Sequence, residues 1–91
     1  MDIIQKELSL QKKANQYALK NFGETDPDTL TSINNLAFLY ESQGRYGEAE
    51  PLYKRFYQLS EEVLGPKHPF TLTSINNLAE LYRSQGMYGE A

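Results

Sequence analysis

With 91 residues, the chain is long enough for one small domain with a modest core. Its formal net charge of −3 argues against general nucleic-acid binding, which needs a basic surface. The absence of cysteine excludes disulfide bonds, thiolate chemistry and cysteine-based zinc sites. No apolar run is long enough to span a membrane, and Lys6 and Glu7 interrupt the only apolar start that could resemble a signal peptide. We therefore expect a cytoplasmic location.

The first predicted element is a helix over residues 2–22. Its apolar residues recur at steps of three and four positions, as they do on one face of a helix. These residues are Ile4, Leu8, Ala14, Tyr17, Ala18 and Phe22. Gly23 suits the left-handed conformation in which many helices end, so it marks the C-terminus of this helix.

A second helix is predicted over residues 27–42. Asp26 is a good N-cap, and Pro27 at the first helical position gives up an N–H that would have no helical partner. The apolar spacing is that of a helix and not the alternation of a strand. The residues on this face are Leu30, Ile33, Leu36, Ala37 and Tyr40.

A turn at residues 43–45 leads to a third helix over residues 46–64. Pro51 falls in its first turns, which fixes the start near residue 46, because a proline deeper inside would cost about 3 kcal/mol. Phe56 occupies the position that Ala14 holds in the leading helix. The sequence leaves open whether this ring pushes the next repeat outward or fills extra space. The apolar face is Ala49, Leu52, Tyr53, Phe56, Leu59, Val63 and Leu64.

Residues 65–67 end the third helix with the sequence Gly-Pro-Lys. His68 and Pro69 then open a fourth helix over residues 69–84, as Asp26 and Pro27 open the second. After another turn, residues 88–91 begin a further helix of the third-helix type.

The chain contains an internal repeat. Residues 29–49 and 71–91 are identical at 18 of 21 positions, at a spacing of 42 residues. Each such unit is too small to bury its own apolar face, so neighbouring units must stack. With A and B for the first and second helix of a repeat, the order is B, A, B, A. We predict one domain over residues 1–91, with a leading helix B (2–22), one repeat (27–64) and a truncated second repeat (69–91).

The repeat pattern resembles the tetratricopeptide signature. The period alone also fits HEAT, armadillo and WD40 units, but helical spacing and the lack of tryptophan exclude WD40. Small Ala37, and Ala79 in the second copy, are expected to let helices A and B approach closely. The departures are isoleucine for tryptophan, alanine for glycine and a longer period. The signature residues are Ile33, Leu36, Ala37 and Tyr40, followed by Ala49 and Tyr53.

The 42-residue variant resembles the repeats of kinesin light chain and of many bacterial, especially cyanobacterial, tetratricopeptide proteins. This resemblance covers essentially the whole chain. It implies an all-α, right-handed solenoid of antiparallel helix pairs that acts as a non-catalytic scaffold for a protein or peptide partner. We also expect the chain to be a fragment of a longer array.

In this family helix A lines a concave groove, and the resemblance carries a set of groove residues onto this chain. Asparagine is a mediocre helix former, so four mid-helix asparagines at matched positions need an explanation. Their amides can donate and accept, and so could hold an extended peptide, chiefly through Asn35 and Asn77. Alternatively, one asparagine of each pair bonds to a neighbouring helix. The predicted groove residues are Asn34, Asn35, Phe38, Glu41, Asn76, Asn77, Glu80 and Arg83.

No arrangement of nucleophile and base is visible. His68, the only histidine, is expected to be a loop or N-cap residue, and one histidine without a carboxylate motif does not make a metal site. Most of the seven tyrosines fit core packing better than base stacking. We predict no enzyme activity, no cofactor, and no nucleic-acid or membrane partner.

The two ends of the predicted array are complementary. Helix 69–84 lacks the helix B that should cover it, and helix 2–22 lacks its own helix A. The chain could therefore form a homo-oligomer, either head to tail, which gives a ring or a filament, or around a twofold axis. A monomer is the alternative. The predicted contact residues are Leu72, Ile75, Leu78 and Tyr82 at one end, and Ile4 and Leu8 at the other.

Overall fold

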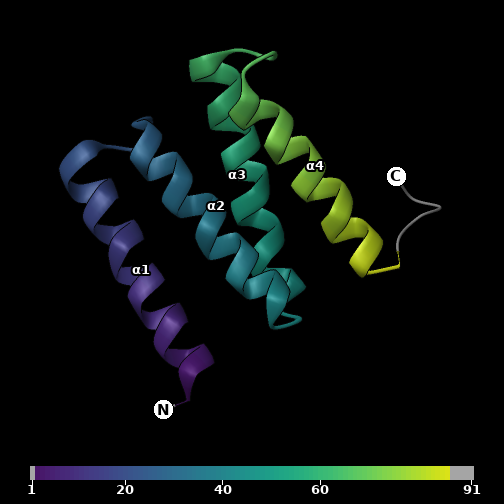
Figure 1. Ribbon diagram of the computed structural model, residues 1–91. Helices are drawn as coiled ribbons and strands as arrows, with labels where there is room; N and C mark the ends of the chain where they lie inside the picture. The colour runs from purple at the N-terminus through teal and green to yellow at the C-terminus, as the bar shows by residue number, and fades with distance from the viewer. Residues whose placement is uncertain (1, 87–91) are drawn as a thin grey trace.

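The computed structural model describes residues 2–86, which form four α-helices (Figure 1). They are α1 (Ile3–Phe22), α2 (Pro27–Ser42), α3 (Tyr46–Leu64) and α4 (Pro69–Ser84). Each helix packs antiparallel against the next one along the chain. The fold is therefore all-α and consists of stacked helix pairs, as the repeat predicts. The helix expected to begin at Tyr88 lies outside the described residues.

The N-termini of α2 and α4 are capped in the same way. Asp26 Oδ1 accepts a hydrogen bond from the Asp28 N–H at 2.9 Å, and His68 Nδ1 accepts one from the Phe70 N–H at 3.0 Å. A proline follows each cap at the start of the helix, where a missing N–H leaves no bond unmade. His68 is thus the N-cap that the sequence predicts.

Glycines end α1 and α3. Gly23 and Gly65 have φ angles of +88° and +97°, in the left-handed region that favours a residue without a Cβ. The Gly23 N–H reaches back to the carbonyl oxygens of Ala18 and Leu19, each at 3.2 Å. The chain can therefore leave each helix sharply and start the next one antiparallel.

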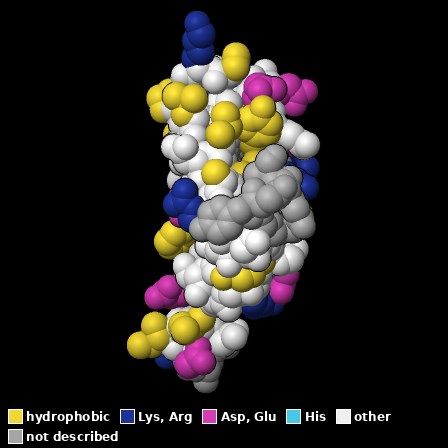
Figure 2. Space-filling model, turned by 90° about the vertical axis from the view of Figure 1, so that its right-hand side faces the viewer, with side chains coloured by type: hydrophobic (Ala, Val, Ile, Leu, Met, Phe, Trp, Pro, Cys, Tyr) yellow, Lys and Arg dark blue, Asp and Glu magenta, His cyan; other side chains and the backbone are white. Residues whose placement is uncertain are grey.

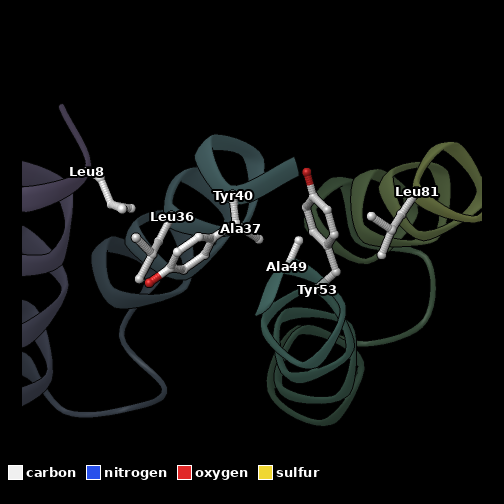
Figure 3. Packing of buried hydrophobic residues seen from close by; sticks show 7 residues of the cluster. All are labelled: Leu8, Leu36, Ala37, Tyr40, Ala49, Tyr53 and Leu81. Carbon is white, nitrogen blue, oxygen red and sulfur yellow. The ribbon is translucent and has the colours of Figure 1, made fainter. Parts of the chain in front are cut away.

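The larger core cluster lies between α2 and α3 and reaches α1 and α4 (Figure 3). Ala37 and Ala49 are 0% exposed at its centre, where small side chains let the two helices approach. Larger side chains fill the space on either side, and each fully buried one contributes about 1.5–3 kcal/mol through its apolar area. The cluster consists of Leu8, Leu36, Ala37, Tyr40, Ala49, Tyr53 and Leu81.

Phe56 answers the question that the sequence left open. Its ring is buried in a second cluster with Leu30, Ile33 and Leu59. The ring of Phe70, at the start of α4, lies against it with a centroid distance of 5.9 Å. Phe56 therefore fills the space between α2, α3 and the beginning of α4.

Several residues that the sequence places in packed positions are exposed, namely Ile4, Ala14, Tyr17, Phe22, Val63 and Ala79. Among the described residues, α1 packs chiefly on α2, and α4 packs chiefly on α3. Each of these outer helices therefore has one side covered and one side open. The prediction of close packing was right for Ala37 and wrong for Ala79, because no described helix lies over that side of α4.

Leucine at Ala37 should lower the free energy of unfolding by about 1–3 kcal/mol, because the added methylene groups have no room between α2 and α3. Ala79→Leu is the matched control at the equivalent, exposed position of the repeat, and should change it by less than about 0.5 kcal/mol. Urea denaturation followed by circular dichroism measures both. Equal losses for the two variants would contradict the close contact at Ala37.

Candidate functional site

A hydrogen bond joins the two A helices. Asn77 Nδ2 donates to Asn34 Oδ1 at 2.8 Å, and both side chains are half-buried. The bond brings α2 and α4 together although they are not consecutive in the chain. For these two residues, the alternative in which an asparagine bonds to a neighbouring helix is therefore correct.

The other predicted groove residues are mostly exposed. Asn35 and Asn76 present their amides to solvent, and Phe38 is 60% exposed although it is aromatic. Glu80 and Arg83 form an ion pair of 3.0 Å within α4, and an exposed pair of this kind contributes at most about 1 kcal/mol. The predicted groove residues thus combine amides, both signs of charge and one apolar ring.

Glu41 differs from the other groove residues because it binds inside the repeat. Its Oε1 accepts a hydrogen bond from the Tyr53 hydroxyl at 2.8 Å, which links α2 to α3. Burial, and then the bond to Glu41, raise the pKa of the Tyr53 phenol well above its ordinary value. Glu41 therefore holds the two helices of the repeat together at the edge of the core.

A second tyrosine–glutamate contact links successive repeats, and the sequence analysis did not predict it. The Tyr82 hydroxyl donates to Glu50 Oε2 at 2.7 Å, and Lys54 Nζ lies 3.2 Å from the same oxygen. The bond from Tyr82, followed by Lys54, lowers the pKa of the Glu50 carboxyl, although its partial burial acts in the opposite direction. The leading helix has Leu8 at the position equivalent to Glu50, which is the sequence difference that could have drawn attention to it.

A hollow of about 360 Å³ opens between α1 and α2. The sequence analysis missed this feature. The repeat register could have drawn attention to it, because Leu10 of α1 is equivalent to Leu52 of α3. Leu52 packs against the core cluster, whereas Leu10 is exposed. The hollow is lined by three polar and three apolar side chains, namely Glu7, Leu10, Gln11, Asn35, Phe38 and Leu39.

The outer face of α4 carries exposed apolar side chains. Leu72 and Ile75 are 51% and 47% exposed, while Leu78 and Tyr82 are half-buried. Figure 2 views the molecule from this side and shows hydrophobic side chains at its surface. The sequence predicts all four residues as contacts at one end of the array, and the exposure of Leu72 and Ile75 agrees with this. Leu78 and Tyr82 instead face α3: Leu78 packs against the core cluster, and the Tyr82 hydroxyl donates to Glu50.

At the other end, the prediction is right for the exposure of Ile4 and wrong for Leu8. Ile4 is exposed, but Leu8 is only 3% exposed and belongs to the core cluster between α1 and α2. Leu8 points towards α2 because the helix places it on the face opposite Leu10. It therefore cannot take part in a contact between copies.

Among residues 2–86, no group of three or more acidic, histidine or cysteine side chains could hold a metal ion. Within the same residues, none of the helices has the length and apolar character needed to cross a membrane.

The family model described as tetratricopeptide repeat matches the chain over residues 8–62 and again over residues 28–91. These matches cover most of the chain, which therefore belongs to the tetratricopeptide repeat family. Repeats of this family generally serve as scaffolds for protein–protein interaction and are typically not catalytic. No curated protein matches the chain. The closer resemblance to kinesin light chain repeats stays a prediction, because the match is to tetratricopeptide repeats in general.

The lowered pKa of Glu50 gives a test of the contact between α3 and α4. A carboxyl whose pKa is lowered on folding stabilises the fold above its ordinary pKa, and this contribution is lost as the pH falls through the lowered value. Tyr82→Phe should therefore lower the melting temperature at about pH 7, and lower it progressively less as the pH falls below the ordinary range of a glutamate carboxyl and protonation removes its charge.

Tyr57→Phe is the control for this experiment. The Tyr57 hydroxyl also donates to a glutamate, Glu61, at 2.7 Å, but within a single helix. Its loss should change the melting temperature little over the same pH range. An effect of Tyr82→Phe that does not depend on pH would contradict the link to the Glu50 carboxylate.

Proposed function

We propose that the chain is a non-catalytic scaffold that binds an extended peptide or protein segment on the surface shared by α2 and α4. The hydrogen bond between Asn34 and Asn77 carries this proposal, because it links the two helices, α2 and α4, that contain the predicted groove residues. The family supports it, since tetratricopeptide repeats generally bind protein or peptide partners.

The chemistry of this surface suits the backbone of a peptide. An extended peptide presents one N–H and one carbonyl group per residue, except at proline, and an asparagine amide can bond to both. Asn35 is exposed, while Asn77 donates one N–H to Asn34 and retains its carbonyl oxygen and second N–H. Phe38 adds an apolar contact beside them. Backbone recognition of this kind is permissive towards the side chains of the ligand.

The test begins with a peptide selected on an array by the purified chain. Replacing Asn35 with alanine should then raise the dissociation constant about fivefold or more, as expected for the loss of about 1 kcal/mol per hydrogen bond. Gln58→Ala, which removes an exposed amide from α3, is the matched control and should leave the affinity unchanged. Isothermal titration calorimetry measures both affinities, and circular dichroism verifies the fold.

Backbone NMR shifts upon titration locate the peptide independently. Shifts confined to α3, together with unchanged affinity for Asn35→Ala, would show that the peptide binds elsewhere and would refute the proposed surface.

The alternative function that we propose is structural self-assembly through the two ends of the array. It is supported by the apolar residues that both outer helices leave exposed, namely Leu72 and Ile75 on α4 and Leu10 and Tyr17 on α1. Exposed apolar residues in this number on a small domain favour association, because contact removes them from water.

A further inference from the structure

We propose that α4 of one copy docks into the hollow between α1 and α2 of a second copy, in the register set by the repeat. This inference rests on the self-assembly function proposed above, and it specifies the residues that meet. The hollow is lined by polar and apolar side chains of α1 and α2, and the repeat itself shows what kind of helix packs against residues at these positions.

The equivalents of the hollow residues, 42 positions further on, surround α2. Glu7, Leu10 and Gln11 correspond to Ala49, Leu52 and Tyr53 of α3, while Asn35 and Leu39 correspond to Asn77 and Leu81 of α4. Ala49, Tyr53 and Leu81 lie in the core cluster that contains Ala37 and Tyr40 of α2. Leu52 packs against the same cluster, and Asn77 bonds to Asn34 of α2. The hollow therefore has the shape of a site for a helix like α2.

The helix most similar to α2 is α4. The two helices are identical at 13 of 16 positions, counted between residues 27–42 and 69–84. The residues with which α2 packs on α3 include Leu30, Ile33 and Ala37. Their equivalents on α4, Leu72, Ile75 and Ala79, are exposed.

Three of the residues that the sequence wrongly placed in packed positions support this docking. Ala14 and Tyr17 of α1 correspond to Phe56 and Leu59 of α3, which pack against α2. In the proposed contact, Ala14 and Tyr17 of one copy lie against the exposed face of α4 of the other copy, which contains Ala79. Ala14, Tyr17 and Ala79, which lack their expected neighbours in the single chain, would thus gain them from a second copy.

Charge distinguishes α4 from α2 as the occupant. Near its C-terminus, α2 carries Glu41, which bonds to Tyr53 of α3. At the equivalent position, α4 carries Arg83. Glu7 and Gln11 line the hollow at that end. A glutamate there would face the like charge of Glu7, but Arg83 can pair with Glu7 and donate to the Gln11 carbonyl oxygen. Among residues 2–86, Arg83 forms an exposed ion pair with Glu80, a contact that is weak and easily exchanged.

The register also predicts a specific polar contact. The hydrogen bond between Asn34 and Asn77 inside one copy becomes a contact between Asn76 of one copy and Asn35 of the next. Both of these amides are exposed in the single chain. The contact uses different surfaces on the two copies, so it is heterologous, and repeated docking extends the array.

Cysteine cross-linking tests this register, because the chain has no cysteine of its own. One preparation carries Asn35→Cys and another carries Asn76→Cys. Mixing them under oxidising conditions, with a short bismaleimide used in parallel, should give a covalent dimer that neither preparation gives alone. Asn34→Cys with Asn77→Cys in one chain is the positive control for the bismaleimide, which should bridge them within the single copy because the two native side chains are in hydrogen-bonding contact.

A charge exchange tests the pairing at the other end of the contact. Arg83→Glu should raise the dissociation constant for self-association about tenfold or more, measured by sedimentation equilibrium, because it sets two carboxylates against each other. Adding Glu7→Lys should restore association. Val63→Asp, on a part of α3 away from the contact and of similar exposure to Ile75, should have no effect.

The outcomes separate this inference from the function on which it rests. Self-association with the mixed cross-link and the charge rescue supports both. If the protein associates but the mixed pair fails to cross-link while the control closes, the register is wrong and self-assembly stands. Cross-linking of Asn76→Cys with itself would show twofold pairing and also overturn the register. A monomer at high micromolar concentration by light scattering would overturn both.

Discussion

The close approach of α2 and α3 at Ala37 and Ala49 is the contact on which the rest of the structure depends. Two alanines with no exposed surface lie where the helices meet, and Tyr53 is fully buried in the same cluster. A helix pair made in this way is apolar on both outer sides. Each pair therefore needs a further helix on either side, and the chain supplies α1 on one side and α4 on the other.

Tyrosines join the helices at the edges of this core, because an aromatic ring can be buried while its hydroxyl reaches a polar partner. Tyr53 reaches Glu41 within the repeat, and Tyr82 reaches Glu50 in the helix before it. Tyr40 is equivalent to Tyr82 but has no such glutamate, since Leu8 holds that position. Instead, the cation of Arg45 lies 4.9 Å from the centre of its ring. Both repeats thus have a tyrosine at this position, but its polar neighbour is Glu50 for Tyr82 and Arg45 for Tyr40.

The helices, their caps and the order of the pairs could be predicted from the sequence, because apolar spacing, Asp26, His68 and the helix-ending glycines act locally. The site could be predicted only in part. The register identified the asparagines, but it could not tell that Asn34 and Asn77 bond to each other while Asn35 stays exposed, since this depends on the rotation of α2 against α4. Leu8 was misassigned for the same reason: one apolar stripe on a helix does not reveal which of its residues faces the neighbour.

The two proposed functions share Asn35. In the proposed stack Asn35 would bond to Asn76 of a second copy and keep its carbonyl oxygen and second N–H for a peptide, as its equivalent Asn77 does within the single chain. The Asn34–Asn77 bond lies where the A helices of successive repeats meet, and a contact between Asn76 and Asn35 of another copy would continue that line of amides by one repeat. A peptide long enough to span two copies would then contact more asparagines on the stack than on a single chain. By linkage, any ligand that binds the stack more tightly than the single chain must also promote stacking. Recognition of an extended partner and growth of the array would therefore be coupled through the same row of asparagines.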